Sequence, residues 1–381
     1  MSESYSGGTP SVGVKEYYGG QIPFIRSAEI NSEITELFLT EEGLKNSSAR
    51  LVAVGDILYA LYGATSGEVG RARLKGAINQ AILAIKPHMD YDSEYIAQWL
   101  RKSKHSIIET YLQGGQGNLS GTIVKELSVD FPSLKEQKEI GDLFHQLDNL
   151  ITLHQRKLGK LINVKKSMLE KMFPKQGSTV PEIRFTGFTN DWEQRKLGDI
   201  GQTYTGLSGK TKDDFGHGQA QFVTYMNVFS NPISNPKMNE PIEVDSKQNE
   251  VEVGDVFFTT SSETPKEVGM TSVLIEKEGK MYLNSFCFGY RLYEKYDSYY
   301  LAYMFRSSSF REKIILLAQG ISRYNISKNK VMEIDVFIPS YKEQIQIGKY
   351  FRDIDTLITL HQCELEKLQN IKKSMLEKMF V

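Results

Sequence analysis

Residues 132–173 read PSLKEQKEIGDLFHQLDNLITLHQRKLGKLINVKKSMLEKMF, and residues 339–380 read PSYKEQIQIGKYFRDIDTLITLHQCELEKLQNIKKSMLEKMF. The two stretches align without a gap at a constant offset of 207 residues, and two-thirds of their positions are identical. This spacing lies far beyond the roughly 20–50 residues of solenoid repeats. The chain is therefore a duplicated half-protein, in which each half is one globular stretch followed by one long helix.

The globular stretches carry a fainter form of the same repeat. The VGD at residues 54–56 returns at residues 253–255, and Asn118 matches Asn325 at the helix offset. The helices have kept their sequence while the domains have diverged. This difference indicates a shared packing constraint or partner for the helices and two different targets for the domains.

Composition places the chain among ordinary globular proteins. It has 381 residues, 40% of them hydrophobic and 24% charged, with a net charge of −1, so charge alone neither suggests nor excludes nucleic acid. Two cysteines cannot form a disulfide framework or a zinc site, and a reducing cytoplasm is the expected location. The N-terminus lacks the features of a signal peptide, and no apolar run is long enough to span a membrane.

Apolar residues in both long stretches follow steps of four and three, which is the heptad seam of a coiled coil. A Pro-Ser pair with a glutamate three residues after the serine indicates each helix start as a capping box. Each helix should be ~57 Å long and needs a partner for its stripe. The predicted seam residues are Ile140, Phe144, Leu147, Ile151, His154, Leu158 and Leu161, with Ile347, Phe351, Ile354, Ile358, His361, Leu365 and Leu368.

The other copy is the simplest partner, and antiparallel pairing suits a chain with a globular domain before each helix. The alternative is two independent surface helices. His154 and His361 occupy equivalent seam positions. They fit a polar layer that fixes the register or, in the sharper reading, a pH switch or metal pair. No cysteine or second histidine lies one turn away in the sequence, so we expect no metal site.

The expected fold class is α+β: two mixed α/β domains separated by two long antiparallel coiled-coil helices, with a pseudo-two-fold internal repeat. Residues 56–62 and 255–259 are predicted strands, and residues 95–112 and 299–317 are predicted helices. The expected boundaries are a first domain at 1–131, a first helix at 132–173, a linker at 174–181, a second domain at 182–338 and a second helix at 339–381.

Polar and basic residues gather in matching loops of the two domains. Arginine, asparagine and glutamine can read base edges bidentately, whereas lysine, serine and threonine suit phosphates. Positions 116–118 and 323–325, just ahead of the long helices, are the strongest candidates. The candidate DNA contacts are Arg26, Ser27, Thr65, Arg71, Arg73, Asn79, Gln80, Gln116 and Asn118 in the first domain, and Lys210, Lys212, Thr224, Tyr225, Asn227, Ser261, Ser262, Lys266, Asn284, Arg323, Tyr324, Asn325 and Lys328 in the second.

Catalytic motifs are not found. The stretch at 205–211, TGLSGKT, imitates a phosphate-binding loop, but Tyr204 stands where that motif needs glycine. Dinucleotide-binding, zinc-protease and serine-hydrolase motifs do not occur either. We therefore expect no catalytic residue and interpret the chain as a reader of its target.

Two variable domains, each followed by a helix that opens PSxKEQ and closes KKSMLEKMF, resemble the specificity subunit of type I restriction–modification enzymes. The sequence DWEQRKLGDI at 191–200 resembles the opening of that family's target-recognition domain. The first domain has no such opening and begins with the segment that should follow it. We therefore expect the first domain to be truncated at its N-terminus, with less secure recognition.

The resemblance implies a non-catalytic subunit whose two domains each read half of a bipartite site in double-stranded DNA, while the helices set the spacer. It implies two methyltransferase subunits for adenine N6 methylation and two motor-nuclease subunits for restriction. No cofactor is expected on this chain; S-adenosylmethionine, ATP and Mg would belong to the partners. The alternatives are a two-headed coiled-coil adaptor that binds proteins, and an enzyme that uses the 209–211 loop.

Overall fold

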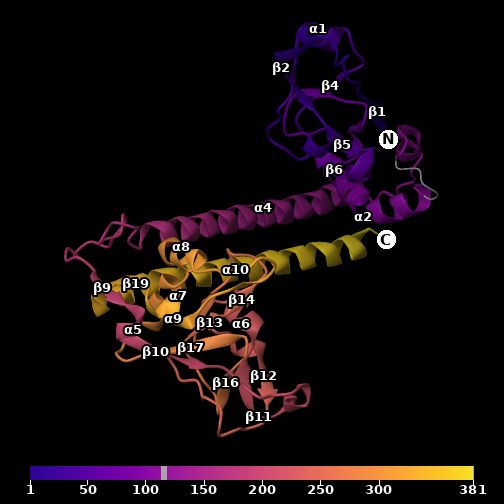
Figure 1. The fold of residues 1–381 in the computed structure, drawn as a ribbon. Coiled ribbons are helices and arrows are strands. Elements are labelled where there is room, and N and C mark those ends of the chain that lie inside the picture. The colour runs from indigo at the N-terminus through magenta and orange to yellow at the C-terminus, as the bar shows by residue number, and fades with distance from the viewer. Residues whose placement is uncertain (113–117, 381) are drawn as a thin grey trace. The chain divides into compact units, whose positions relative to one another are not determined.

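The computed structural model describes residues 1–112 and 118–380, which fall into two compact units. Unit 1 comprises Met1–Gln155 with residues 363–380, and unit 2 comprises Arg156–Gln362. Each unit thus holds one globular domain and one part of each long helix (Figure 1).

The long helices are α4, Leu134–Lys171, and α10, Tyr341–Met379. In unit 1, Phe144 stacks on Phe380, and Asp148 lies 2.5 Å from Lys372. In unit 2, the equivalent pair is Lys165 and Asp355, at 2.6 Å. Positions further along α4 meet earlier positions of α10 in both units, which confirms the predicted antiparallel coiled coil.

Each globular core receives the end of a long helix. Phe380, at the end of α10, packs against Tyr95 and Phe144 in the core of unit 1. Phe173, just after α4, packs against Tyr300 and Phe351 in the core of unit 2. The closing Met-Phe pair of the repeated sequence therefore packs in a core in both units, which explains its identity in both copies.

The domain of unit 1 has an antiparallel sheet with the strand order β1-β8-β5-β6 and a mixed sheet with the order β3-β2-β7-β4, in which β2 and β7 are parallel. The strands are β1 Ser2–Ser6, β2 Tyr18–Ile25, β3 Phe38–Leu39, β4 Arg50–Val52, β5 Ile57–Ala60, β6 Val69–Arg71, β7 Gly76–Ile78 and β8 Ile82–Pro87, and the helices are α1 Glu41–Lys45, α2 Ser93–Tyr111 and α3 Gly121–Lys125, with 3-10 turns at Lys15–Tyr17, Ser27–Glu29 and Gly63–Thr65.

Unit 2 repeats this topology with the orders β10-β17-β13-β15 and β12-β11-β16, and it adds the pairs β14-β18 and β19-β9. Its strands are β9 Glu193–Lys196, β10 Gly201–Thr205, β11 Phe215–Val223, β12 Asn239–Ile242, β13 Val256–Thr259, β14 Ser261–Ser262, β15 Thr271–Val273, β16 Met281–Leu283, β17 Cys287–Leu292, β18 Tyr324–Asn325 and β19 Asp335–Ile338. Its helices are α5 Leu197–Ile200, α6 Tyr225–Ser230, α7 Ser298–Met304, α8 Ser308–Leu316 and α9 Lys328–Met332, with 3-10 turns at Lys212–Asp214 and Pro236–Met238.

The register of the first sheet is the same in both units. Tyr5 of β1 faces Ala84 of β8, and Tyr204 of β10 faces Gly289 of β17. The Tyr204 hydroxyl donates to Asp255 of the repeated VGD turn, and in unit 1 Lys86 lies over the Tyr5 ring and pairs with Asp56 of that turn. The glycine of the turn has a φ of 94° in unit 1 and 97° in unit 2. A positive φ at both places explains why glycine occurs there twice.

Two predictions at helix ends are wrong. The expected helix over 299–317 is broken into α7 and α8, because Ser307 ends the first segment and caps the second by accepting from the Phe310 N–H. The capping box at Ser340 does not form either. Glu343 is instead turned to Arg184, with oxygens at 2.7 and 2.9 Å from the guanidinium nitrogens. Within the described residues, no helix is long and apolar enough to cross a membrane.

Candidate nucleic-acid interface

The strongest candidate positions of unit 2 lie on a short ladder between β14 and β18. Ser261 pairs with Asn325, and Ser262 pairs with Tyr324. Asn325 also exchanges two backbone hydrogen bonds with Gln319, at 2.8 and 2.9 Å. The backbone of this loop is thus held on both sides, so its side chains are presented from a fixed frame.

Helix α6 supports this ladder through a hydrogen bond to β14. The Tyr225 hydroxyl donates to the Ser261 carbonyl at 2.7 Å, and Thr224 caps the helix by accepting from the Asn227 N–H. Burial raises the pKa of the Tyr225 hydroxyl, and the nearby Arg323 charge acts in the opposite direction. Tyr225 therefore remains a neutral structural donor at physiological pH.

Three exposed side chains at the ladder have no side-chain partner in the described chain. Arg323, Asn325 and Lys328 make no side-chain hydrogen bond or ion pair with the residues that the structure describes. A free guanidinium, a free amide and a free ammonium are the groups that recognise guanine, adenine and phosphate, respectively. Lys212 and Lys266 are also exposed and free of partners within the described chain, on neighbouring loops.

A surface groove of about 360 Å³ lies beside the ladder. It runs from Thr205 and Ser208 on one side to Thr260 and Lys328 on the other. Hydroxyls and one cation face an otherwise apolar floor, which suits contact with a sugar-phosphate backbone better than the enclosure of a small molecule.

Unit 1 repeats the ladder as a single bridge between Tyr62 and Asn118. The Asn118 side chain also accepts from the Gly63 N–H at 3.4 Å, and Thr65 donates to the Tyr62 carbonyl. Tyr62 occupies the place of Ser261, and Asn118 that of Asn325, so the same backbone bridge carries different side chains in the two domains. Gln116 lies outside the described residues.

A family model for the type I restriction modification DNA specificity domain matches residues 1–163 and 189–370. The chain belongs to this family. The matched ranges contain both globular domains and most of both long helices. The type I specificity domain therefore occurs twice, as the internal repeat indicates.

Curated relatives carry the same description. The type I restriction enzyme MjaVIII specificity subunit of Methanocaldococcus jannaschii is 22% identical over 97% of this chain and 88% of its own length. The MjaIX specificity subunit of the same organism is 26% identical over 72% of this chain and 67% of its own length.

Solved structures agree in fold. The type I restriction–modification S subunit from M. genitalium has a TM-score of 0.57 at 15% identity, covering all of this chain and 94% of that one. A chain from a study of complex assembly and conformational transition of the type I R-M system has a TM-score of 0.51 at 12% identity, covering all of this chain and 97% of that one. The expected fold class of this specificity-family chain is confirmed.

Several predicted contacts of unit 2 serve its internal structure instead. Asn227 is fully buried and donates to Asn235 and Asn239, and Asn284 donates to the Val223 carbonyl. Lys210 pairs with Asp245 at 2.8 Å, and this contact raises the pKa of the lysine.

The same holds for the basic residues of unit 1. Arg26 is bound by Glu29 and Glu36, Arg71 by Glu94, and Arg73 by Glu33. The Asn79 side chain accepts a hydrogen bond from the Ala81 N–H, and the Gln80 side chain accepts one from the Thr9 hydroxyl. Ser27 begins a 3-10 turn. For Arg71 and Arg73 sequence alone cannot show this pairing, because Glu94 and Glu33 lie 23 and 40 residues away, whereas Glu29 is only three residues from Arg26.

Sequence reasoning missed exposed apolar residues around the unit 2 ladder. Phe286 is 58% exposed, and its carbonyl accepts from Thr260; Ile321 is 95% exposed, two residues before Arg323. Apolar side chains in a major groove contact the thymine methyl group. For Ile321 the available signal was a single apolar residue inside a polar loop, whereas Phe286 directly precedes strand β17 and reads as part of it.

The predicted seam residues line the less exposed face of both helices, and the seam is most buried near the domains. Ile140, Phe144 and Leu147 are buried in unit 1, as are Ile347, Phe351 and Ile354 in unit 2. Ile151 and His154, Leu158 and Leu161, Ile358 and His361, and Leu365 and Leu368 are half-buried.

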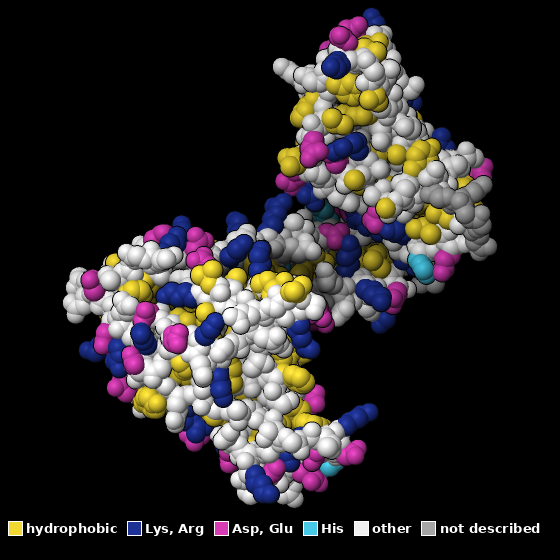
Figure 2. All heavy atoms as spheres, viewed as in Figure 1, with side chains coloured by type: hydrophobic (Ala, Val, Ile, Leu, Met, Phe, Trp, Pro, Cys, Tyr) yellow, Lys and Arg dark blue, Asp and Glu magenta, His cyan; other side chains and the backbone are white. Residues whose placement is uncertain are grey.

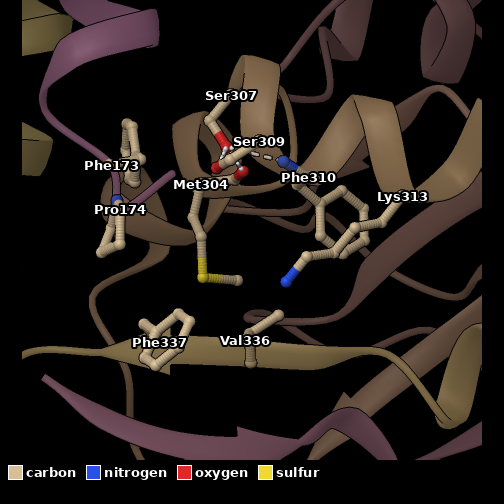
Figure 3. A pocket seen from close by; sticks show the side chains of 9 residues that line it. All are labelled: Phe173, Pro174, Met304, Ser307, Ser309, Phe310, Lys313, Val336 and Phe337. Carbon is tan, nitrogen blue, oxygen red and sulfur yellow. Dashed lines mark hydrogen bonds between the residues drawn. The ribbon is translucent and has the colours of Figure 1, made fainter. Parts of the chain in front are cut away.

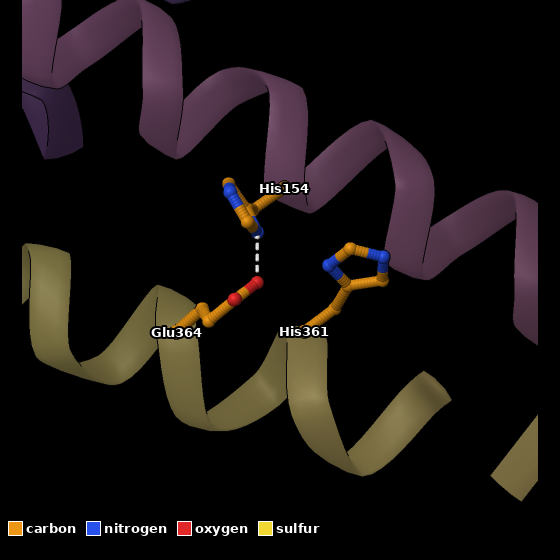
Figure 4. A group of neighbouring side chains, drawn as sticks. All are labelled: His154, His361 and Glu364. Atoms are coloured by element: carbon orange, nitrogen blue, oxygen red, sulfur yellow. Dashed lines mark ion pairs between the residues drawn. The ribbon is translucent and has the colours of Figure 1, made fainter. Parts of the chain in front are cut away.

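His154 lies on the seam of unit 1 and forms an ion pair with Glu364, 3.0 Å from Nδ1 to the carboxylate (Figure 4). His361 precedes that glutamate by one turn of α10. The acidic partner supports the interpretation of His154 as a polar seam position.

One cavity of unit 2 is too small to hold more than a water molecule. A cavity between Phe173, Met304 and Phe310 has about 20 Å³ of space, enough for one water molecule, and Lys313 at its edge donates to the Asp335 carbonyl at 2.6 Å (Figure 3). Figure 2 shows basic and acidic side chains interspersed over the face drawn.

Proposed function

We propose that this chain is the DNA-reading, non-catalytic subunit of a type I restriction–modification enzyme, in which each domain binds one half of a bipartite site. The observation that carries the proposal is the Asn118 and Asn325 bridge. It holds the same backbone frame in both domains while the presented side chains differ. One frame with two sets of side chains suits two half-sites of different sequence.

The long helices would set the unspecified spacer between the half-sites and dock two methyltransferase subunits, which would methylate adenine N6 and bring S-adenosylmethionine. Two motor-nuclease subunits would join for restriction with ATP and Mg. The preserved sequence of the two helices supports a common partner, because identical surfaces in both copies offer the same binding site twice.

Single-molecule mapping of N6-methyladenine in cells that express this chain with its methyltransferase partner tests the proposal. A split motif with a fixed gap, present only when this chain is supplied, is the expected result. If methylation is unchanged while the purified chain still binds the methyltransferase subunits, the protein-binding adaptor is the better account.

A further inference from the structure

A buried glutamine joins the globular domain of unit 1 to the start of its long helix. Gln137 of α4 is 2% exposed, and its side-chain oxygen accepts from the Asp92 backbone N–H at 3.0 Å. Its amide nitrogen donates to the Pro132 carbonyl at 2.9 Å. Both polar ends of the side chain are therefore satisfied inside the protein, and Asp92, which caps α2, is tied to the first turn of α4.

Unit 2 builds the same contact from the repeated residues. Gln344 of α10 is 3% exposed, accepts from the Asp297 N–H at 3.1 Å and donates to the Pro339 carbonyl at 3.0 Å. Asp297 caps α7 by accepting from the Tyr300 N–H at 2.8 Å, as Asp92 caps α2. The first domain helix of each unit is thus fixed to its long helix through the same three groups.

A tyrosine three residues after each capping aspartate makes a further contact. Tyr95 is buried, and its hydroxyl donates to the Asp130 carbonyl at 3.1 Å, just ahead of α4. Tyr300 is also buried, and its hydroxyl donates to the Phe337 carbonyl at 3.2 Å, just ahead of α10. The domains have diverged, yet these contacts to the helix start use the same residue types in both units, which indicates a common geometric constraint.

A glycine in each long helix allows the close approach of the capped domain helix. A Cβ at Gly141 would lie 2.5 Å from the Asp92 carboxylate and 3.3 Å from the Tyr95 backbone nitrogen. A Cβ at Gly348 would overlap the Asp297 carboxylate in the same way. Glycine is a poor helix former, so the close approach explains why it stands one turn after the glutamine in both helices.

We propose that this joint, formed by Gln137 and Gly141 in unit 1 and by Gln344 and Gly348 in unit 2, fixes each recognition domain on its helix and so limits the enzyme to one spacer length. The four residues are positioning residues, and the inference rests on the proposed function. A gap that is wrong by one base pair displaces a half-site by ~3.4 Å along the duplex and by ~35° about it. A domain held by a rigid joint cannot follow that displacement, so a wrong gap costs affinity.

The test measures binding of the assembled methyltransferase complex to duplexes that keep both half-sites and change the gap by one base pair in either direction. Gln137→Ala removes the tie to α2, and Gly141→Ala displaces the capping aspartate. In both variants we expect discrimination against the wrong gaps to fall by about tenfold, the effect of losing one or two buried hydrogen bonds. Discrimination between bases within each half-site should stay unchanged. Gln344→Ala should act alike from unit 2.

Gly159→Ala is the matched control, because it makes the same substitution on α4 at a place where a Cβ would meet no atom within 4 Å. It should leave the gap selectivity unchanged. Hydrogen exchange of the complex without DNA gives a second readout: the Asp92 amide should exchange about tenfold faster in Gln137→Ala, because its acceptor is gone.

Faster exchange together with relaxed gap selectivity supports the proposal. Full gap selectivity in Gln137→Ala and Gly141→Ala, or unchanged exchange at Asp92, overturns it. A loss of base discrimination along with gap selectivity also overturns it, because the joint would then stabilise the fold of the domain rather than its placement. If the complex of the unsubstituted chain recognises no split site, the proposed function itself fails, and the joint has no spacer to set.

Discussion

The two cysteines of this specificity-family chain should differ in reactivity, because one is buried and the other is exposed. Cys287 is buried in β17, and desolvation raises the pKa of its thiol to about 12, whereas Cys363 on α10 is exposed. The thiolate is the reacting species, and it is scarce at any pH well below the pKa. At pH 8 we expect Ellman's reagent to modify one thiol of the native protein rapidly. Cys363→Ser should remove that phase, and two fast-reacting thiols would contradict the burial of Cys287.

Arg323 carries the residue-scale prediction about DNA. If its free guanidinium reads a guanine, Arg323→Ala should reduce discrimination at one base pair by about 1–3 kcal/mol. Binding of the assembled methyltransferase complex to site variants, at one fixed salt concentration, measures the change. Arg352→Ala, an exposed arginine of α10, is the matched control. Uniform weakening across all sequences would instead identify Arg323 as a phosphate contact.

At the scale of elements, the internal repeat offers a matched pair of glutamates. Glu343→Gln breaks a buried ion pair at the start of α10. The substitution should lower the free energy of unfolding by about 2 kcal/mol or more, because it leaves the charge of Arg184, which is only 16% exposed, without its partner. Glu136→Gln changes the exposed counterpart on α4. This substitution should change the free energy of unfolding by no more than about 0.5 kcal/mol. Urea unfolding followed by tryptophan fluorescence compares them. Equal effects would mean that the contact with Arg184 is not stabilising.

Sequence predicted the two helices and their seam well, because a heptad pattern of such length depends on local spacing alone. It failed where a distant residue took over a local role. The capping box at Ser340 was plausible from four adjacent residues, but Arg184, 159 positions away in sequence, holds Glu343 instead. The break between α7 and α8 has a local cause instead, because Ser307 caps a helix inside a stretch of helical periodicity.

At the scale of the whole molecule, the helices would determine the DNA spacer. Inserting one heptad after Leu161 and another after Leu368 keeps the seam in phase and lengthens each helix by ~10 Å. We expect a methylated motif with an unchanged pair of half-sites and a gap longer by about three base pairs, from the 3.4 Å rise of B-DNA. Methylation mapping measures the gap, and an insertion at one site only serves as the mismatched control. An unchanged gap would show that the helices do not set the spacer between the half-sites.

The two domains provide the complementary prediction. Replacing residues 182–338 with the second domain of another specificity subunit should change one half of the recognised motif and leave the other half and the gap intact. The domains have separate cores, so the exchange leaves the packing of unit 1 undisturbed. A change in both halves of the motif would contradict independent reading.

The sequence by itself determined the duplication, the α+β class, the antiparallel pairing and the family, because each rests on periodicity or on stretches that repeat in register. Only the tertiary structure decided which polar residues are free. Arg71 and Arg73 pair with carboxylates that are distant in sequence, whereas Arg323 and Lys328 have no such partner in the described chain.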